Sequence, residues 1–158
     1  MQHSKRYERG EWLKTPYAGS DAKDPERAVM DLLEGYGVQQ RQWTDHKGPN
    51  GRVAVTLRFQ LNEKVYRISI ETLDVARAEP RELRKQALRV IYWTLKPLLE
   101  NALLFGGPDR LLLPFMEDDT GRTVYEQLQP YLSEQKFQAK HLLGYATRPA
   151  LPAPGQQP

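Results

Sequence analysis

Apolar and polar residues follow a helical spacing in the first patterned stretch of the chain. From Asp24 onward, apolar residues recur every three or four positions as far as Tyr36, which is the spacing of one buried helical face. Asp24 is a suitable N-cap and Pro25 a suitable first helical residue. Gly35 and Gly37 are typical of a helix end, because glycine adopts the left-handed conformation without strain. The pattern predicts a helix between Asp24 and these glycines.

The next stretch alternates between apolar and polar residues, as a strand with one buried face does. Two such runs, RVAVTLRF and VYRISI, flank Asn62 and Glu63. A two-residue loop at Asn62 and Glu63 would place Phe59 opposite Tyr66 and predicts a β-hairpin. All six apolar residues of the pairing then share one face, and a shift by one residue would scramble them: Val55, Leu57, Phe59, Tyr66, Ile68 and Ile70. Residues 38–44 are a weaker, polar candidate for a third strand.

A second helical pattern, the longest of the chain, runs from Pro80 to Phe105. Its apolar residues make one broad face: Leu83, Ala87, Val90, Ile91, Leu95, Leu98, Leu99, Ala102 and Leu103. Pro97 removes one backbone hydrogen bond inside this helix and predicts a kink near Trp93. The glycines that follow Phe105 end the helix, and Asp109 is a candidate cap for a short element over residues 109–115.

The stretch FMEDDTGRTVYEQL, residues 115–128, allows three interpretations: a metal site, an active-site loop or a turn between two elements. Thr123 and Glu126 have the spacing of a capping box, which predicts that a helix begins there with Leu128 on its buried side. Short acids and glycine are the usual residues of the turn that precedes such a helix. Metal binding would need ligands from elsewhere in the chain. The sequence therefore favours a turn with solvated acids.

Together these elements predict an α+β fold. It comprises an N-terminal helix, a two- to three-stranded antiparallel sheet, a long kinked helix packed on the sheet, and short C-terminal helices. Residues 1–23 show no periodicity and are expected to form an irregular arm. Residues 24–143 are expected to form a single domain. Residues 144–158 are rich in proline and are expected to form a flexible tail.

Composition narrows the candidate chemistry. The 158 residues include no cysteine, which excludes disulfides and thiolate metal sites and favours a reducing compartment. The N-terminal residues lack the apolar core of a signal peptide, and no segment has the ~20 apolar residues of a membrane span, so a cytoplasmic protein without membrane partners is expected. The three histidines lack ligand spacing, and no phosphate-binding loop or nucleophile motif is present. We therefore predict no catalytic residue, metal, cofactor or small-molecule ligand, and an enzyme is the least favoured class.

Charge is distributed unevenly and suggests a basic surface. Twelve lysines and arginines but only six acidic residues lie between Arg41 and Lys96. The predicted hairpin register places Arg58 directly opposite Arg67, where like charges repel by up to about 1 kcal/mol unless a negative group is near. The long helix carries a stripe within about 80° of its circumference, made of Arg81, Lys85, Arg89, Tyr92 and Lys96. These seven residues are the candidate phosphate-binding set, with Tyr92 or Trp43 available for stacking on bases.

The same residues also have a purely structural interpretation. Glu71 or Glu82 could neutralise the arginines, and lysine and arginine are common on any solvated helix face. Tyr92 and Trp93 could simply form the half-buried edge of the core.

The order of these features resembles that of a group of small, functionally unassigned proteins of bacteriophage and mobile-element genomes. The resemblance covers about residues 28–128 and includes a Leu-Pro segment before an Asp-Gly-Arg-Thr-Val-like turn: Leu113, Pro114, Asp119, Gly121, Arg122, Thr123 and Val124. Thr120 is an extra residue in that turn. The group has no assigned catalytic residues, so the resemblance implies a context, a phage-type accessory protein acting on or near nucleic acid, and no chemistry.

Two hypotheses for function follow from the sequence. The first is a non-enzymatic accessory protein that binds nucleic acid through the basic hairpin and helix. The second is a protein-interaction module, an adaptor or an inhibitor of host machinery, whose aromatic N-terminal arm or Pro-rich tail becomes ordered on a host or phage protein.

Overall fold

A computed structural model describes residues 5–18, 24–48 and 52–133 of the chain. The chain divides into two compact units, residues 1–124 and residues 125–158. The first unit contains helices and a three-stranded antiparallel sheet, so the predicted α+β fold is confirmed. Within the second unit, α5 (Val124–Ser133) is described, and the predicted tail over residues 144–158 lies outside the described residues.

Helix α2 (Pro25–Gly35) has the limits that its end signals predict. The Asp24 carboxylate accepts hydrogen bonds from the backbone N–H groups of Glu26 and Arg27, which have no partner inside the helix. Gly37 has a φ of 81°, the left-handed conformation that closes the helix. Both predicted ends are thereby confirmed.

The sheet has the order β2-β3-β4, formed by β2 (Arg41–Lys47), β3 (Val53–Leu61) and β4 (Lys64–Glu71). The predicted hairpin register is confirmed, since Phe59 pairs with Tyr66 and Arg58 with Arg67. Asn62 and Glu63 have φ values of 50° and 64°, which is the backbone of a type I′ turn. Strand β2 begins three residues later than the predicted 38–44 segment, and Val38, before its start, is buried in the main core.

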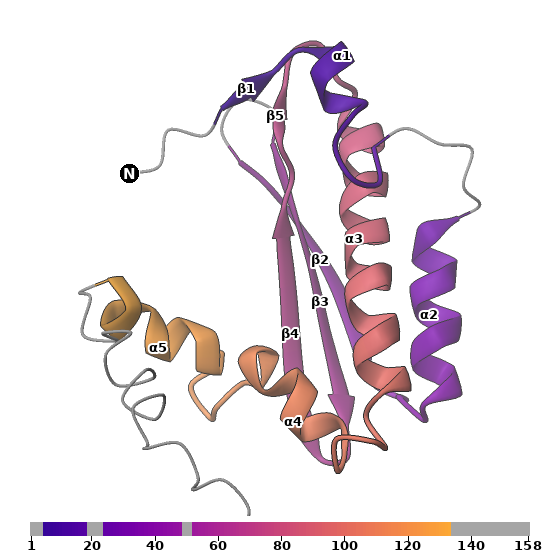
Figure 1. The fold of residues 1–158 in the computed structure, drawn as a ribbon, viewed down its shortest axis with the longest axis vertical. Helices are drawn as coiled ribbons and strands as arrows, with labels where there is room; N and C mark the ends of the chain where they lie inside the picture. The colour runs from indigo at the N-terminus through magenta and orange to yellow at the C-terminus, as the bar shows by residue number, and fades with distance from the viewer. Residues whose placement is uncertain (1–4, 19–23, 49–51, 134–158) are drawn as a thin grey trace, which may run out of the picture. The chain divides into compact units, whose positions relative to one another are not determined.

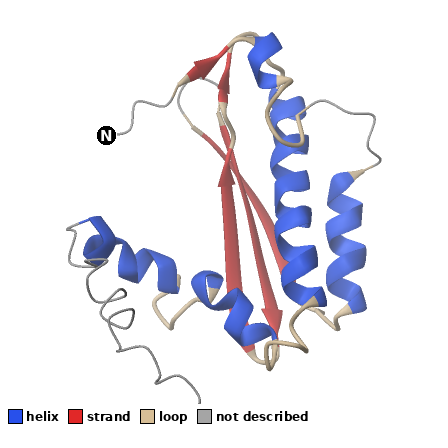
Figure 2. Cartoon of the chain, viewed as in Figure 1, coloured by secondary structure: helices blue, strands red, loops and turns tan. Residues whose placement is uncertain are grey.

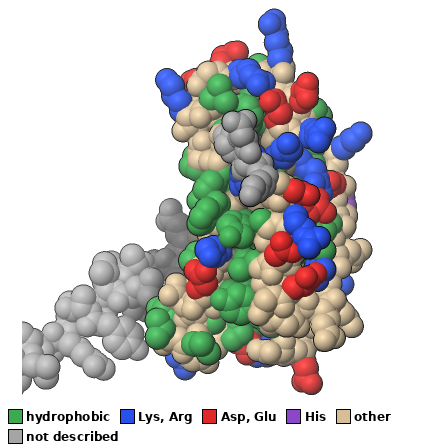
Figure 3. Space-filling view, turned by 90° about the vertical axis from the view of Figure 1, so that its right-hand side faces the viewer, with side chains coloured by type: hydrophobic (Ala, Val, Ile, Leu, Met, Phe, Trp, Pro, Cys, Tyr) green, Lys and Arg blue, Asp and Glu red, His purple; other side chains and the backbone are tan. Residues whose placement is uncertain are grey.

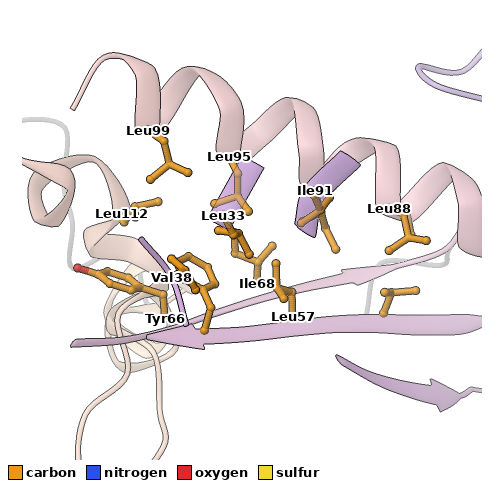
Figure 4. Close-up of a cluster of buried hydrophobic side chains, with 14 of the residues drawn as sticks. Leu33, Val38, Leu57, Tyr66, Ile68, Leu88, Ile91, Leu95, Leu99 and Leu112 are labelled. Atoms are coloured by element: carbon orange, nitrogen blue, oxygen red, sulfur yellow. The ribbon is translucent and has the colours of Figure 1, made fainter. Parts of the chain in front are cut away.

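Helices α2 and α3 (Pro80–Glu100) lie on one face of this sheet (Figures 1 and 2). Leu88, Ile91, Leu95 and Leu99 project from α3 toward the strands, where they meet side chains such as Leu57 (Figure 4). Each such side chain, once fully buried, contributes about 1.5–3 kcal/mol before conformational entropy is subtracted. The apolar face that the hairpin register creates is therefore the floor of the main core.

The C-terminal end of α3 differs from the prediction. The helix continues through Pro97 and ends at Glu100, before the predicted Phe105. Leu103, expected on the buried face, is 91% exposed, because the chain has already left the helix and turns at Gly106 and Gly107. The kink near Trp93 stays a prediction.

The N-terminal arm is ordered in its described part, so the expectation of an irregular segment is wrong there. Strand β1 (Arg6–Tyr7) pairs in parallel with β5 (Asp74–Val75), and α1 (Arg9–Trp12) follows. Trp12 is 1% exposed and packs with Val75 and Leu83 in a second, smaller core. No sequence periodicity signals this arrangement, because both elements are too short to show one.

The segment after α3 forms α4 (Pro108–Leu112) and a short 3-10 helix, Leu113–Phe115. The N-cap of α4 is Gly107, and no side chain caps it, so the predicted capping role of Asp109 is wrong. Asp109 instead accepts hydrogen bonds from the Lys64 ammonium and the Tyr66 hydroxyl. The Lys64 hydrogen bond, followed by that of Tyr66, lowers the pKa of Asp109.

In the second unit Leu128 and Leu132 of α5 are 41% and 44% exposed, so the prediction that this helix has a buried side at Leu128 is wrong.

Truncation of Leu95 tests the main core. Leu95→Ala should lower the free energy of unfolding by about 2–5 kcal/mol, because it removes a fully buried side chain and leaves a cavity. Leu103→Ala is the matched control and should change it by less than about 0.5 kcal/mol, since that side chain is solvated. Urea denaturation measures both. Equal effects would contradict the observed end of α3.

The hairpin turn gives a second stability prediction. A non-glycine residue in the left-handed conformation costs roughly 1–2 kcal/mol, and Glu63 is in that conformation. Glu63→Gly should therefore raise the free energy of unfolding by about 1 kcal/mol. Glu63→Ala removes the same carboxylate but keeps the strain, so thermal unfolding of this control should show no gain. A gain in both variants would mean that charge, not backbone strain, is responsible.

Candidate nucleic-acid interface

The two hairpin arginines share a single acid, Glu117. The Arg58 Nε donates to one carboxylate oxygen of Glu117 at 2.7 Å, and the Arg67 Nε donates to the other at 2.8 Å. The Glu117 side chain is only 3% exposed, whereas Arg58 and Arg67 are 50% and 25% exposed. The like charges that the register places side by side are thus bridged by a carboxylate.

Glu117 reaches this position because its own segment joins the edge of the sheet. The Glu117 N–H donates to the Val65 carbonyl at 2.8 Å, and Met116 forms a β-bridge with Tyr66. The expectation that all three acids of residues 117–119 are solvated turn residues is therefore wrong for Glu117. The repulsion between Arg58 and Arg67 was a signal that a negative group lies near. Sequence could not identify Glu117 as that group, because it lies 50 residues beyond Arg67.

The rest of the segment is the predicted turn. The Asp118 carboxylate accepts hydrogen bonds from the backbone N–H groups of Thr120 and Arg122 and from the Thr120 hydroxyl. The Thr120 hydroxyl, followed by the Arg122 N–H, lowers the pKa of Asp118. Gly121 has a φ of 77°, and its carbonyl accepts a hydrogen bond from Arg67. The Asp118 carboxylate thus holds the backbone of the turn, and the Gly121 carbonyl holds the Arg67 side chain.

Not every residue of the predicted basic stripe on α3 is free to contact a ligand. Arg89 is buried, and its Nη1 donates to the Tyr17 carbonyl at 3.0 Å. Lys96 pairs with Glu100 one turn later, and this hydrogen bond raises the pKa of Lys96. Tyr92 packs against the main core, as does Trp43, so neither offers the free ring expected for stacking. These residues therefore have contacts within the fold, and their part in phosphate binding stays a prediction.

Arg81 and Lys85 differ from the rest of the candidate set. Across the described parts of the chain, neither forms a side-chain hydrogen bond or an ion pair within 4.0 Å. Both line a hollow of about 330 Å³ between the first turns of α2 and α3. Arg84, beside them, is held by Asp45 and Glu26; burial lowers the pKa of Arg84, but the hydrogen bonds to these two acids outweigh burial and raise it. Arg81 and Lys85 are thus the cations left for an external anion.

The hairpin arginines and the helix stripe do not form one continuous surface. Side chains alternate between the two faces of a strand, so Arg58 points away from the face that Leu57 and Phe59 present to α3. The sheet therefore separates Arg58 and Arg67 from Arg81 and Lys85. On the side of the first unit that carries α2, basic and acidic side chains alternate in the upper half, and hydrophobic side chains run beside them (Figure 3). The basic face predicted from charge counts is in fact two small surfaces.

Neutralising Glu117 tests the bridge between the hairpin arginines. Glu117→Gln should lower the free energy of unfolding by about 1–3 kcal/mol, because two partly buried guanidinium groups lose their charged acceptor. Glu71→Gln is the matched control. Glu71 also pairs with an arginine, Arg52, but is 63% exposed, so the effect should stay below about 1 kcal/mol. Chemical denaturation of both variants at low and high salt measures the difference, and a smaller loss for Glu117→Gln than for Glu71→Gln would contradict the bridge.

General features of the chain add little to this site. Among residues 5–18, 24–48 and 52–133, no three His, Asp or Glu side chains are grouped so that they could hold a metal ion. Nor does any helix in those ranges have the length and apolarity needed to cross a membrane. Comparison of the chain with protein-family models, curated proteins and solved structures finds no match. Conclusions about function therefore rest on the residues described above.

Proposed function

We propose that the chain is a small non-enzymatic accessory protein that associates with nucleic acid through the first half of α3. The observation that carries this proposal is the state of Arg81 and Lys85. Of the six cationic side chains in the candidate set, these are the two with no side-chain hydrogen bond or ion pair within 4.0 Å among the described residues; Glu82, which attracts Lys85, is itself paired with Arg9. Cations that the fold does not use are the ones that can neutralise phosphates.

The placement of these two residues suits a phosphate backbone. They are one helical turn apart, about 6 Å along the axis of α3. Each contact between a lysine or arginine and a phosphate releases condensed counterions and so gives affinity that falls with salt concentration. Arg84 and Asp24 also line the hollow, but Asp45 and Glu26 offset the charge of Arg84, so the positive charge offered there comes from Arg81 and Lys85. The site offers charge but, in its described residues, no group of acids for metal-dependent chemistry.

The sequence resemblance supplies the context for this proposal. Small proteins of bacteriophage and mobile-element genomes share the Leu-Pro segment and the Gly-Arg-Thr-Val turn found here at Leu113–Pro114 and residues 121–124. An accessory role near phage-type nucleic acid is consistent with a phosphate-binding surface that carries no catalytic constellation.

A protein-interaction module is the second candidate, favoured by one specific observation. Leu103, Leu104 and Phe105, in the turn after α3, are 91%, 84% and 54% exposed. Adjacent exposed apolar side chains of this kind are typical of a contact site for a partner protein. The N-terminal arm is a weaker basis for this candidate than the sequence suggested, because its Trp12 is already buried against the fold.

Charge reversal distinguishes the two candidates. The full chain should bind a labelled oligonucleotide with an affinity that falls steeply as salt rises, and Lys85→Glu should reduce both the affinity and the steepness. Arg110→Glu makes the same change in net charge on an exposed residue of α4, remote from the hollow, and should have little effect. Fluorescence anisotropy across a salt series measures both. Absence of salt-dependent binding, or equal losses in the two variants, would exclude this interface and favour the protein-interaction candidate.

A further inference from the structure

An exposed pair of aromatic rings, Tyr17 and Trp93, lies on the outer side of α3. Their ring centroids are 6.3 Å apart and their planes differ by 8°. Trp93 is 49% and Tyr17 42% exposed, whereas Trp12 is 1% exposed. Tyr92, which packs against the main core, contacts the Trp93 ring edge-on, with the two ring centroids 5.2 Å apart. The pair thus combines a fixed orientation with large exposed ring surfaces.

The backbone of Tyr17 is strained in order to hold this position. Its φ is 62°, a left-handed conformation that is uncommon for a residue with a side chain. The Tyr17 carbonyl accepts a hydrogen bond from Arg89, whose side chain is buried under the arm. Residues kept in sparsely populated conformations occur where the surrounding structure forces them, and they concentrate at functional sites. Arg89, a member of the candidate phosphate-binding set, thus contacts the backbone of the residue that carries an aromatic ring.

A second buried polar side chain, Gln86, fixes the chain just before Tyr17. Its amide nitrogen donates to the Thr15 hydroxyl at 3.0 Å and to the Pro16 carbonyl at 2.8 Å. Its amide oxygen accepts a hydrogen bond from the Trp12 indole at 2.7 Å. A fully satisfied buried network of this kind imposes one conformation. Two buried polar residues of α3 thus hold the arm in the place where Tyr17 stacks on Trp93.

Hydrophobic burial alone does not account for this arrangement. An arm that only covered apolar surface would bury its aromatic rings, as it does with Trp12. Tyr17 and Trp93 instead keep about half of their surface in solvent, although backbone strain and two buried polar anchors are needed to bring them together. The structure therefore maintains an exposed aromatic surface that its core does not require.

Trp93, one ring of the pair, lies on the same helix as Arg81 and Lys85, whereas Tyr17 belongs to the N-terminal arm. Lys85 is two turns before Trp93, about 12 Å along the helix axis, and Arg81 is about 18 Å away. Proteins that bind single strands combine a basic track for the phosphates with aromatic side chains on which unpaired bases stack. In a duplex the base faces are already stacked on one another, so an aromatic ring on the protein surface adds nothing.

From this geometry we infer that Tyr17 and Trp93 form a stacking platform for an unpaired base, so that the nucleic acid bound is single-stranded. This inference rests on the proposed function. A strand that runs along α3 would place phosphates at Arg81 and Lys85 and a base against the exposed rings. Arg89 and Gln86 act as positioning residues, since they hold the arm and do not touch the strand.

The test compares an oligothymidine with a mixed-sequence duplex of the same length, each binding to the full chain. The single strand should bind more tightly and should quench the fluorescence of Trp93, the most exposed tryptophan in the described chain. Trp93→Ala should weaken binding of the single strand by roughly 5- to 100-fold but leave the salt dependence unchanged, because the cations remain. Trp93→Phe keeps a stacking ring and should stay within about threefold of the parent while losing most of the quenching.

Phe105→Ala is the matched control, since it removes a ring that is 54% exposed in the turn after α3, beyond the helix end that is farther from Arg81 and Lys85. Far-ultraviolet circular dichroism checks whether each variant is folded. If the duplex binds as tightly as the single strand, or if Trp93→Ala matches Phe105→Ala, the stacking platform is wrong while the phosphate interface stands. If neither nucleic acid binds in a salt-dependent way, the proposed function fails and the inference fails with it.

Discussion

The antiparallel pairing of β3 with β4 is the constraint on which the rest of the first unit depends. Because Phe59 pairs with Tyr66 and Leu57 with Ile68, one face of the hairpin is continuously apolar. Helices α2 and α3 can bury their own apolar faces only on that side, so the position of both helices follows from the register. The same register decides that Arg58 and Arg67 share the opposite face. A turn at Asn62 and Glu63 therefore sets both the core and the first of the two basic surfaces.

Buried polar side chains attach the peripheral segments to this framework. Glu117 joins the segment after α4 to the hairpin, and Gln86 and Arg89 join the N-terminal arm to α3. Burial of these three side chains does not by itself stabilise a core, since each needs several hydrogen bonds to offset its loss of hydration. Each instead specifies one position for a segment that has little apolar surface of its own. These contacts also define the candidate interface. Arg58, Arg67 and Arg89 take part in them, which leaves Arg81 and Lys85 as the cations of the candidate set that can contact a ligand.

Charge counted along a sequence overestimates the charge that a surface offers. The excess of basic residues between Arg41 and Lys96 is real, yet four of the six candidate cations have partners. All of these partners lie outside that span: Glu117 for both Arg58 and Arg67, the Tyr17 carbonyl for Arg89, and Glu100 for Lys96. A screened surface pair contributes little to stability, but it still reduces the field that a phosphate would meet. Arg81 and Lys85 remain because the acids near them are bonded to other arginines: Glu26 and Asp45 to Arg84, and Glu82 to Arg9.

Elements with local signals could be predicted from the sequence alone. The cap at Asp24, the hairpin register and the start of α3 at Pro80 each depend on residues a few positions apart, and all three are confirmed. Contacts between distant segments set the partners of Arg58, Arg67 and Arg89, the burial of Trp12 and the exposure of Trp93. Trp93 left one sequence signal, since it lies roughly 200° around the helix from the buried Ile91, but nothing in the local pattern connects it to Tyr17. Such contacts join residues about 50 to 76 positions apart. Short-range periodicity carries no information about which distant segment will arrive there.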